Sequence, residues 1–210
     1  MRLMKHTFRL LVCLTIVLAT SSGFLYAQER GRLISVVKSG MTPSISEPGG
    51  RLVPTNLVVV EVIEFKLAGV PIIPGHPFPA GDDWLKDLTV KVKNISAKPI
   101  SYLSMDFALP EAKYVKDGRE YRMGFSLEYK EGSRAKEGAG EMKVVGPGEE
   151  VELVYLGPSY SSFRQQVAKN TGVTSITSLQ SGGDMRVHFT DGSIWIGSNL
   201  RIHSQAGHSY

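Results

Sequence analysis

Few side chains stand out as candidates for chemistry, and His188 and Trp195 are the first of them. They flank the dipeptide Asp191-Gly192 within two alternating segments. If these segments form a hairpin with a two-residue loop, both rings lie on the outer face of a sheet. An exposed tryptophan can stack on a sugar or anchor a partner protein, so we predict His188, Trp195 and the second tryptophan, Trp84, as binding residues. The alternative is that the tryptophans are buried, because a register shift of one residue exchanges the two faces.

Glu61 is the candidate for catalysis, because it interrupts the most apolar segment of the chain, residues 57–65. A buried glutamate has a raised pKa and can act as a general acid. Together with a second carboxylate it would resemble the acid pair of a glycosidase. The alternative is an ordinary edge position, or an ion pair with Lys66 or Lys91. No spacing of acidic residues reproduces a glycosidase pattern.

Metal ligands are sparse, and we predict neither a metal nor a cofactor. Zinc needs three or four converging ligands, and beyond the first 27 residues the chain keeps four histidines: His76, His188, His203 and His208. Asp82-Asp83 offers oxygens for calcium, but calcium takes six or more. We expect a solvated pair of carboxylates at a loop end instead. The zinc-protease, nucleophile-elbow, phosphate-loop and dinucleotide motifs are all absent from the sequence.

Alternation of apolar and polar residues is the dominant pattern after residue 30, and it predicts strands. The pattern is regular over residues 87–95, 101–108, 121–129 and 150–156, with weaker signals at 33–37 and 174–179. Residues 57–65 are apolar in both rows, which is typical of a central strand. Alternation with one wet face favours antiparallel sheets.

Turn signals complete a prediction of eight or nine strands in one domain over residues 28–210. Asp191-Gly192 suits a two-residue turn that pairs His188 with Trp195, and Asp117-Gly118 and Pro147-Gly148 predict two more turns. One short helix is expected at residues 159–170, with Gly172 just past its end. The proline-rich stretch 67–84 cannot be a central strand, because proline lacks a backbone donor.

The first 27 residues have the layout of a secretory signal peptide. Three basic residues precede an apolar run at 10–18, and small residues lead to Ala27. Cleavage there predicts a mature chain that starts at Gln28 in a secreted or periplasmic location, with no stable membrane span, since the apolar run is too short for one. It also removes Cys13, the only cysteine, and lowers the net charge from +4 to +1. Such a balance argues against nucleic-acid binding.

Three stretches resemble immunoglobulin-like or fibronectin-like β-sandwich domains of secreted bacterial proteins. Residues 88–100 resemble a strand that ends in Val-x-Asn before the next strand begins. Gly146-Pro147-Gly148 resembles the turn that opens a later strand, and residues 189–195 resemble the Phe-x-Asp-Gly-Thr-x-Trp hairpin of uncharacterised secreted bacterial proteins. The resemblance implies a scaffold, an all-β immunoglobulin-like antiparallel sandwich, and it transfers no activity.

Taken together, these patterns predict an exported binding or interaction module without catalytic activity. Its partner would be an extracellular or periplasmic protein or polysaccharide. Two alternatives are a sandwich-type hydrolase that uses Glu61, and a purely structural exported domain.

Overall fold

The structure, a computed structural model, describes residues 30–36, 42–129, 144–197 and 201–202. These residues form a mostly antiparallel β-sheet with one α-helix, which confirms the predicted β-rich, mainly antiparallel character in outline. The predicted leader, residues 1–27, lies outside the described residues, as do His203 and His208.

Within the described residues, thirteen strands join in one open sheet. Its order is β13-β4-β7-β10-β9-β8-β11-β12-β2-β3, with β1 beside β11, β5 beside β4 and β6 beside β1. Two of the pairings, β1 with β11 and β13 with β4, are parallel. The strands are β1 (Arg30–Val36), β2 (Ser44–Ser46), β3 (Val53–Pro54), β4 (Val60–Leu67), β5 (Val70–Ile72), β6 (Phe78–Ala80), β7 (Leu88–Asn94), β8 (Ile100–Lys116), β9 (Arg119–Tyr129), β10 (Glu150–Val154), β11 (Ser178–Phe189), β12 (Ile194–Gly197) and β13 (Arg201–Ile202).

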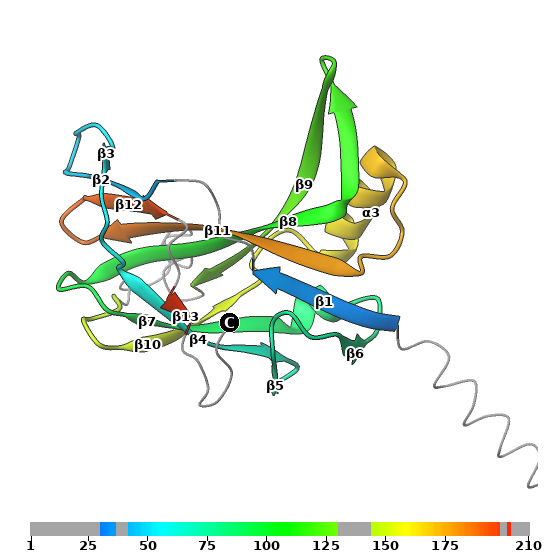
Figure 1. The fold of residues 1–210 in the computed structure, drawn as a ribbon, viewed down its shortest axis with the longest axis horizontal. Coiled ribbons are helices and arrows are strands. Elements are labelled where there is room, and N and C mark those ends of the chain that lie inside the picture. Colours follow the sequence, from blue (N-terminus) through cyan, green and yellow to red (C-terminus); the bar gives the residue numbers. More distant parts are fainter. Residues whose placement is uncertain (1–29, 37–41, 130–143, 198–200, 203–210) are drawn as a thin grey trace, which may run out of the picture.

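The sheet curls around a single apolar core. In Figure 1, β8, β11 and β12 lie above β4, β7 and β10, and buried side chains from both parts belong to one cluster. The indole of Trp195 on β12 donates to the carbonyl of Leu57, which precedes β4, at 3.2 Å. That bond joins two segments that are distant along the order of the sheet.

The strongest alternation patterns are confirmed. Along β7, Leu88, Val90 and Val92 are fully buried, whereas the intervening residues are half-buried. The predicted strand at 101–108 is the inner part of β8, which continues to Lys116. The weaker signal at 33–37 falls in β1. The end of the signal at 174–179 and the first segment of the predicted hairpin, before Asp191-Gly192, belong to one strand, β11, with a register shift between Ser181 and Asp184.

The double apolar row of residues 57–65 has a specific cause. The pairing of β4 with β7 shifts register between Val62 and Glu64. Val60 and Val62 are buried before the shift, and Phe65 is buried after it. The extra residue at the shift therefore changes the buried positions from even-numbered to odd-numbered ones. β4 has neighbours on both sides, as a central strand should.

The predicted register of the hairpin at Asp191-Gly192 is wrong. His188 lies opposite Ile194, and Val187 lies opposite Trp195. The amide of Phe189 donates to the carbonyl of Ser193 at 2.9 Å, so the loop has three residues rather than two. The turn therefore moves Trp195 from the expected outer face to the core face.

The immunoglobulin-like sandwich of eight or nine strands is not confirmed at that level of detail, because the described strands form one open sheet of 13. The additional strands β2, β3, β5, β6 and β13 have two or three residues each. Segments so short leave no alternation for a sequence pattern to detect. β5 and β6 each pair with one neighbour, β4 and β1 respectively, and this edge position suits their prolines.

Candidate functional site

Arg32 is the central residue of a polar network between β1, β6 and the segment before β11. Its side chain is 1% exposed. Nε donates to the carbonyl of Ala80 at 3.3 Å, and Nη1 donates to Ser175 Oγ at 3.2 Å and to the carbonyl of Ile176 at 2.9 Å. Nη2 donates to Asp82 Oδ1 at 2.6 Å. A buried guanidinium needs this many acceptors, so Arg32 fixes three separate segments relative to one another.

Trp84 fixes the next segment, the short 3₁₀ helix η1 (Trp84–Asp87), in the same network. Its ring is 2% exposed and meets Phe78 edge-on, with centroids 5.4 Å apart. The indole nitrogen donates to the carbonyl of Ile176 at 2.9 Å, which is the carbonyl that Arg32 also uses. Arg32 and η1 are therefore both held by the same segment, the one that precedes β11.

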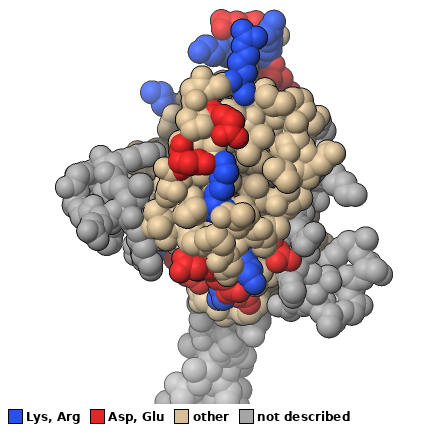
Figure 2. Space-filling model, turned by 90° about the vertical axis from the view of Figure 1, so that its left-hand side faces the viewer, with Lys and Arg blue, Asp and Glu red and all other residues tan. Residues whose placement is uncertain are grey.

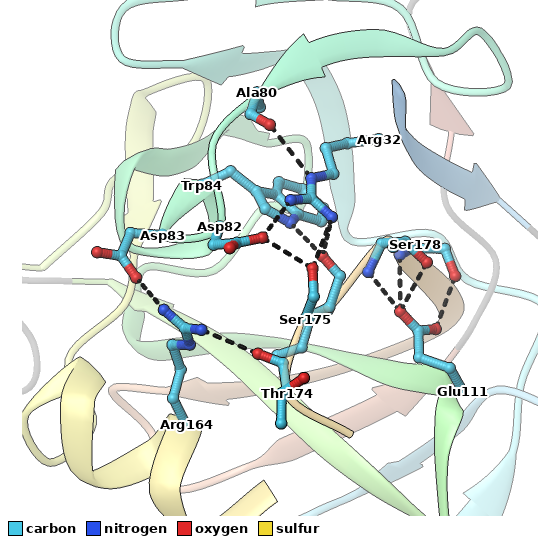
Figure 3. Close-up of polar contacts among 12 residues, drawn as sticks. Arg32, Ala80, Asp82, Asp83, Trp84, Glu111, Arg164, Thr174, Ser175 and Ser178 are labelled. Atoms are coloured by element: carbon cyan, nitrogen blue, oxygen red, sulfur yellow. Dashed lines mark hydrogen bonds and ion pairs between the residues drawn. The ribbon is translucent and has the colours of Figure 1, made fainter. Parts of the chain in front are cut away.

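Two neighbouring carboxylates, Asp82 and Asp83, connect this network to the helix (Figure 3). Ser175 Oγ donates to Asp82 at 2.8 Å. This hydroxyl and the guanidinium of Arg32 hold the pKa of Asp82 below its usual range. Asp83 accepts from Arg164 Nη1 at 2.7 Å, and Arg164 Nη2 donates to the carbonyl of Thr174 at 2.9 Å. Both carboxylates are thus paired with arginines, while each side chain stays 52% exposed, as expected of a solvated pair at a loop end.

The helix α3 (Tyr160–Thr171) closes the other side of the site. Ser159 is its N-cap, and Gly172 ends it in the left-handed conformation with φ of 77°, as predicted from the sequence. Phe163 and Val167 face the core. The residues at positions 161, 164, 165 and 168 repeat with helical spacing on a different face, which is turned toward η1.

A groove with a volume of about 540 Å³ lies between α3 and η1 and is open to solvent. This volume is within the range of small-molecule sites, about 300–1,000 Å³. Most of the lining residues carry a polar or charged group at the end of the side chain, but carbon atoms make up most of the surface that faces the groove. These residues are Asp83, Lys86, Tyr160, Ser161, Arg164, Gln165, Ala168 and Thr174.

The groove offers both hydrogen-bond donors and acceptors to a ligand. Lys86 and Arg164 donate, Asp83 accepts, and the amide of Gln165 and the hydroxyl of Ser161 do both. Burial raises the pKa of Tyr160 to about 12, so its phenol stays neutral at physiological pH and donates to the carbonyl of Asp82 at 3.4 Å. The lining holds one carboxylate, which is half of the acid pair that glycoside hydrolysis requires.

Glu111 on β8 holds the start of β11, which follows the segment that Arg32 and Trp84 bind. Its Oε1 accepts from the amides of Thr177 at 2.5 Å and Ser178 at 3.0 Å, and its Oε2 accepts from Ser178 Oγ at 2.8 Å. Burial would raise the pKa of Glu111, but the hydrogen bonds to Ser178 and Thr177 outweigh it and lower the pKa below its usual range. The carboxylate therefore stays ionised and bound.

The three residues predicted to bind a ligand do not come together. Trp84 and Trp195 are 2% and 0% exposed, so neither ring is available at the surface. The expected exposed aromatic face is wrong because of the three-residue turn, which exchanges the faces of β12. His188 is half-buried on the opposite face, where its ring meets Tyr102 edge-on with centroids 5.1 Å apart.

Glu61 also lies away from the groove. In the sheet it is opposite Lys93 on β7 and Arg201 on β13, and it is half-buried. Among the described residues, no group of three or more His, Cys, Asp or Glu side chains could hold a metal ion.

The residues that build the site were missed in the sequence for different reasons. Arg32 shares a strand face with Ile34, and an arginine on a core face is a signal that the alternation pattern contained. Arg164 and Gln165 lie on the polar side of the predicted helix, where most charged residues are merely solvated. Nothing local marks Glu111 as the acceptor of several hydrogen bonds.

No protein-family model, curated protein or solved structure matches this chain. In the part of the chain that the structure describes, no helix has the length and apolarity to span a membrane. The fold and the groove thus define the protein as a β-rich chain with an open groove that is lined by residues with charged and polar groups.

Proposed function

We propose that this protein is an exported binding module whose ligand occupies the groove between α3 and η1. The observation that carries the proposal is that the groove is preorganised. Asp83 in the lining is paired with Arg164, and the neighbouring Asp82 is paired with Arg32, which is buried with four hydrogen bonds to fixed partners. A site that is already ordered loses little conformational entropy when a ligand binds.

The chemistry of the lining favours a short saccharide. Sugar hydroxyls donate and accept hydrogen bonds, and the groove supplies both functions from Asp83, Arg164 and Gln165 over a short distance. Lys86 and Arg164 against Asp83 give the lining an excess of one positive charge. A neutral saccharide or one with a single acidic group is therefore the ligand class that we propose.

Export is part of the proposal and rests on the signal-like layout of residues 1–27. It places the module outside the cytoplasm, where polysaccharides of the cell envelope are accessible. Mass spectrometry of the protein from the growth medium or periplasm should find a chain that begins at Gln28. A chain that keeps Met1 and sediments with membranes would contradict export.

The finer architecture is also a proposal. We propose that the curled sheet serves as the same kind of two-layer scaffold as an immunoglobulin-like domain, with the site at one end. It is supported by the single core shared by β4, β7 and β10 with β8, β11 and β12. The alternative is a purely structural exported domain. A ligand screen that finds no bound ligand would favour it.

Binding to a glycan array tests the proposal, with two neighbouring glutamines as a matched pair. Gln165 lines the groove, whereas Gln166 is exposed on the helix and is not part of the lining. We expect Gln165→Ala to weaken saccharide binding by about tenfold, because it removes one to two hydrogen bonds, and Gln166→Ala to leave it unchanged. Absence of any saccharide bound by the unaltered protein, or equal effects of the two variants, would overturn the proposal.

A further inference from the structure

The outer part of the β8–β9 hairpin, residues 113–122, forms an arm that projects from the sheet. β8 and β9 pair along it from Lys113 with Arg122 to Lys116 with Arg119. The pairing of β11 with β8 ends at Ala108, and β10 pairs with β9 near its other end. Figure 1 shows the two strands rising away from the rest of the molecule. In the described part of the chain, the arm therefore has no third strand, and both of its edges are open.

The arm carries more positive than negative charge. Figure 2 shows Lys and Arg side chains crowded at the top of the molecule, over this hairpin, with acidic side chains beside them. Lys113 pairs with Glu120 at 3.0 Å, and Arg122 donates to Gln180 at 3.2 Å. Among the described residues, Lys116 has no ion pair.

Arg119, the cross-strand neighbour of Lys116, likewise has no ion pair among the residues that the structure describes. Two exposed cations at the tip of a narrow ribbon attract an acidic partner.

A pair of tyrosines gives the arm a firm apolar surface next to these cations. Tyr114 and Tyr121 are opposite each other, and their rings stack with centroids 5.6 Å apart. Cross-strand partners share a face, so the tyrosines lie on the same face as Lys116 and Arg119. Val115, on the other face, is 73% exposed. The stacked pair stiffens a ribbon that would otherwise be marginally stable as two strands alone.

The β8 edge of the arm is the better of its two edges for an added strand. The turn at Asp117-Gly118 has two residues with positive φ, 53° and 72°, so Lys116 and Arg119 form its hydrogen-bonded closing pair. Bonding alternates along an antiparallel ribbon, so the backbone N–H and C=O of Val115 point outward. Residues 113–116 contain two lysines and no acid, whereas the β9 edge contains Glu120.

We propose that the arm docks an acidic, extended segment of a partner protein, which adds as a strand to the β8 edge and places carboxylates against Lys116. An outward-facing row of backbone donors and acceptors can be used by another polypeptide backbone, and this favours a protein over a polysaccharide or a membrane as the occupant. The surface is separate from the groove, so this inference is independent of the proposed function.

Fluorescence anisotropy with a labelled eight-residue peptide of alternating Glu and Val tests the inference on the mature chain. We expect binding that weakens by about fivefold or more in Lys116→Glu and is unchanged in Lys169→Glu, the same charge change at an exposed position of α3. The same peptide with N-methyl groups at alternate residues should not bind, because it lacks the backbone donors that a new strand needs.

Two proline variants distinguish the edges. Val115→Pro removes an outward-facing N–H and is tolerated by an edge strand, so the fold should persist while peptide binding is lost. Glu120→Pro makes the equivalent change on the β9 edge and should retain binding. The inference is overturned if the acidic peptide does not bind at millimolar concentration, if N-methylation has no effect, or if a sulfated polysaccharide binds the arm and displaces the peptide.

Discussion

Charged side chains serve opposite purposes around η1 and on the β8–β9 arm. Near η1, the guanidinium of Arg32 is buried and hydrogen-bonded to Ala80, Asp82, Ser175 and Ile176. On the arm, by contrast, cations are exposed at the tip of a two-stranded ribbon. Burial and partners, rather than residue type, therefore decide whether a charge holds the fold together or is free to meet a ligand.

The largest effect should come from separating two adjacent aspartates. Asp82 and Asp83 have equally exposed side chains, 52% each, but Asp82 pairs with buried Arg32 and Asp83 with the more exposed Arg164. Asp82→Ala leaves a buried guanidinium without its carboxylate and should lower the free energy of unfolding by about 2 kcal/mol. Asp83→Ala should change it by less than about 0.5 kcal/mol.

Urea unfolding of both variants measures this difference. Equal losses would mean that the burial of Arg32 does not distinguish the two pairs, and the comparison between the regions would fail at its strongest point.

A smaller loss is expected at Glu111. Glu111→Ala removes the acceptor for the amides of Thr177 and Ser178 and should cost about 1–2 kcal/mol. Glu111→Gln keeps one acceptor oxygen and should recover more than half of that loss. Glu120→Ala, which breaks an exposed pair on the arm, is the matched control and should change thermal stability little. A control as damaging as Glu111→Ala would contradict the assignment.

The pH dependence of stability should reflect the hydrogen-bonded carboxylates Asp82 and Glu111. The pKa values of Asp82 and Glu111 are lowered in the folded protein from ordinary values of 3.8 and 4.5. Their stabilisation is therefore complete above these ordinary values and is lost as the pH falls through the lower folded-state values. Unfolding free energies measured from pH 7 downward should fall less steeply in Asp82→Ala and Glu111→Ala than in the unaltered protein. Parallel curves would argue against the prediction.

The smallest effect is expected on the arm. Lys116→Glu and Arg119→Glu alter exposed side chains that have no ion pair in the described structure, and each should change the free energy of unfolding by less than about 0.5 kcal/mol. Differential scanning calorimetry would test this. A loss comparable with that of Asp82→Ala would show that the arm is part of the stable core and not a surface for binding.

Local signals in the sequence predicted local structure well. The alternation of residues 87–95 and the capped helix before Gly172 needed nothing from the rest of the chain. The two Asp-Gly turns show the limit. At Asp117-Gly118 both residues have positive φ, as a two-residue turn requires, whereas at the second turn it is Gly192 that does, with φ of 84°. One extra loop residue there reversed the prediction for Trp195.

The candidate site was out of reach for a different reason. Arg32 and Ser175 are 143 positions apart, and Arg164 and Asp83 are 81 positions apart. Their contacts arise when β1 pairs with β11 and α3 comes to lie beside η1, and no local pattern encodes that meeting. The arginine on a core face was the one signal available, and an arginine on a strand face is usually solvated.

Mapping the ligand on the protein tests the central claim most directly. The saccharide with the strongest array signal would be titrated into ¹⁵N-labelled protein while backbone amide shifts are recorded. The groove model predicts that the largest shifts fall on α3 around Arg164 and Gln165 and on η1 around Lys86, with the arm unchanged. Shifts concentrated elsewhere on the sheet, with none at α3 or η1, would contradict it.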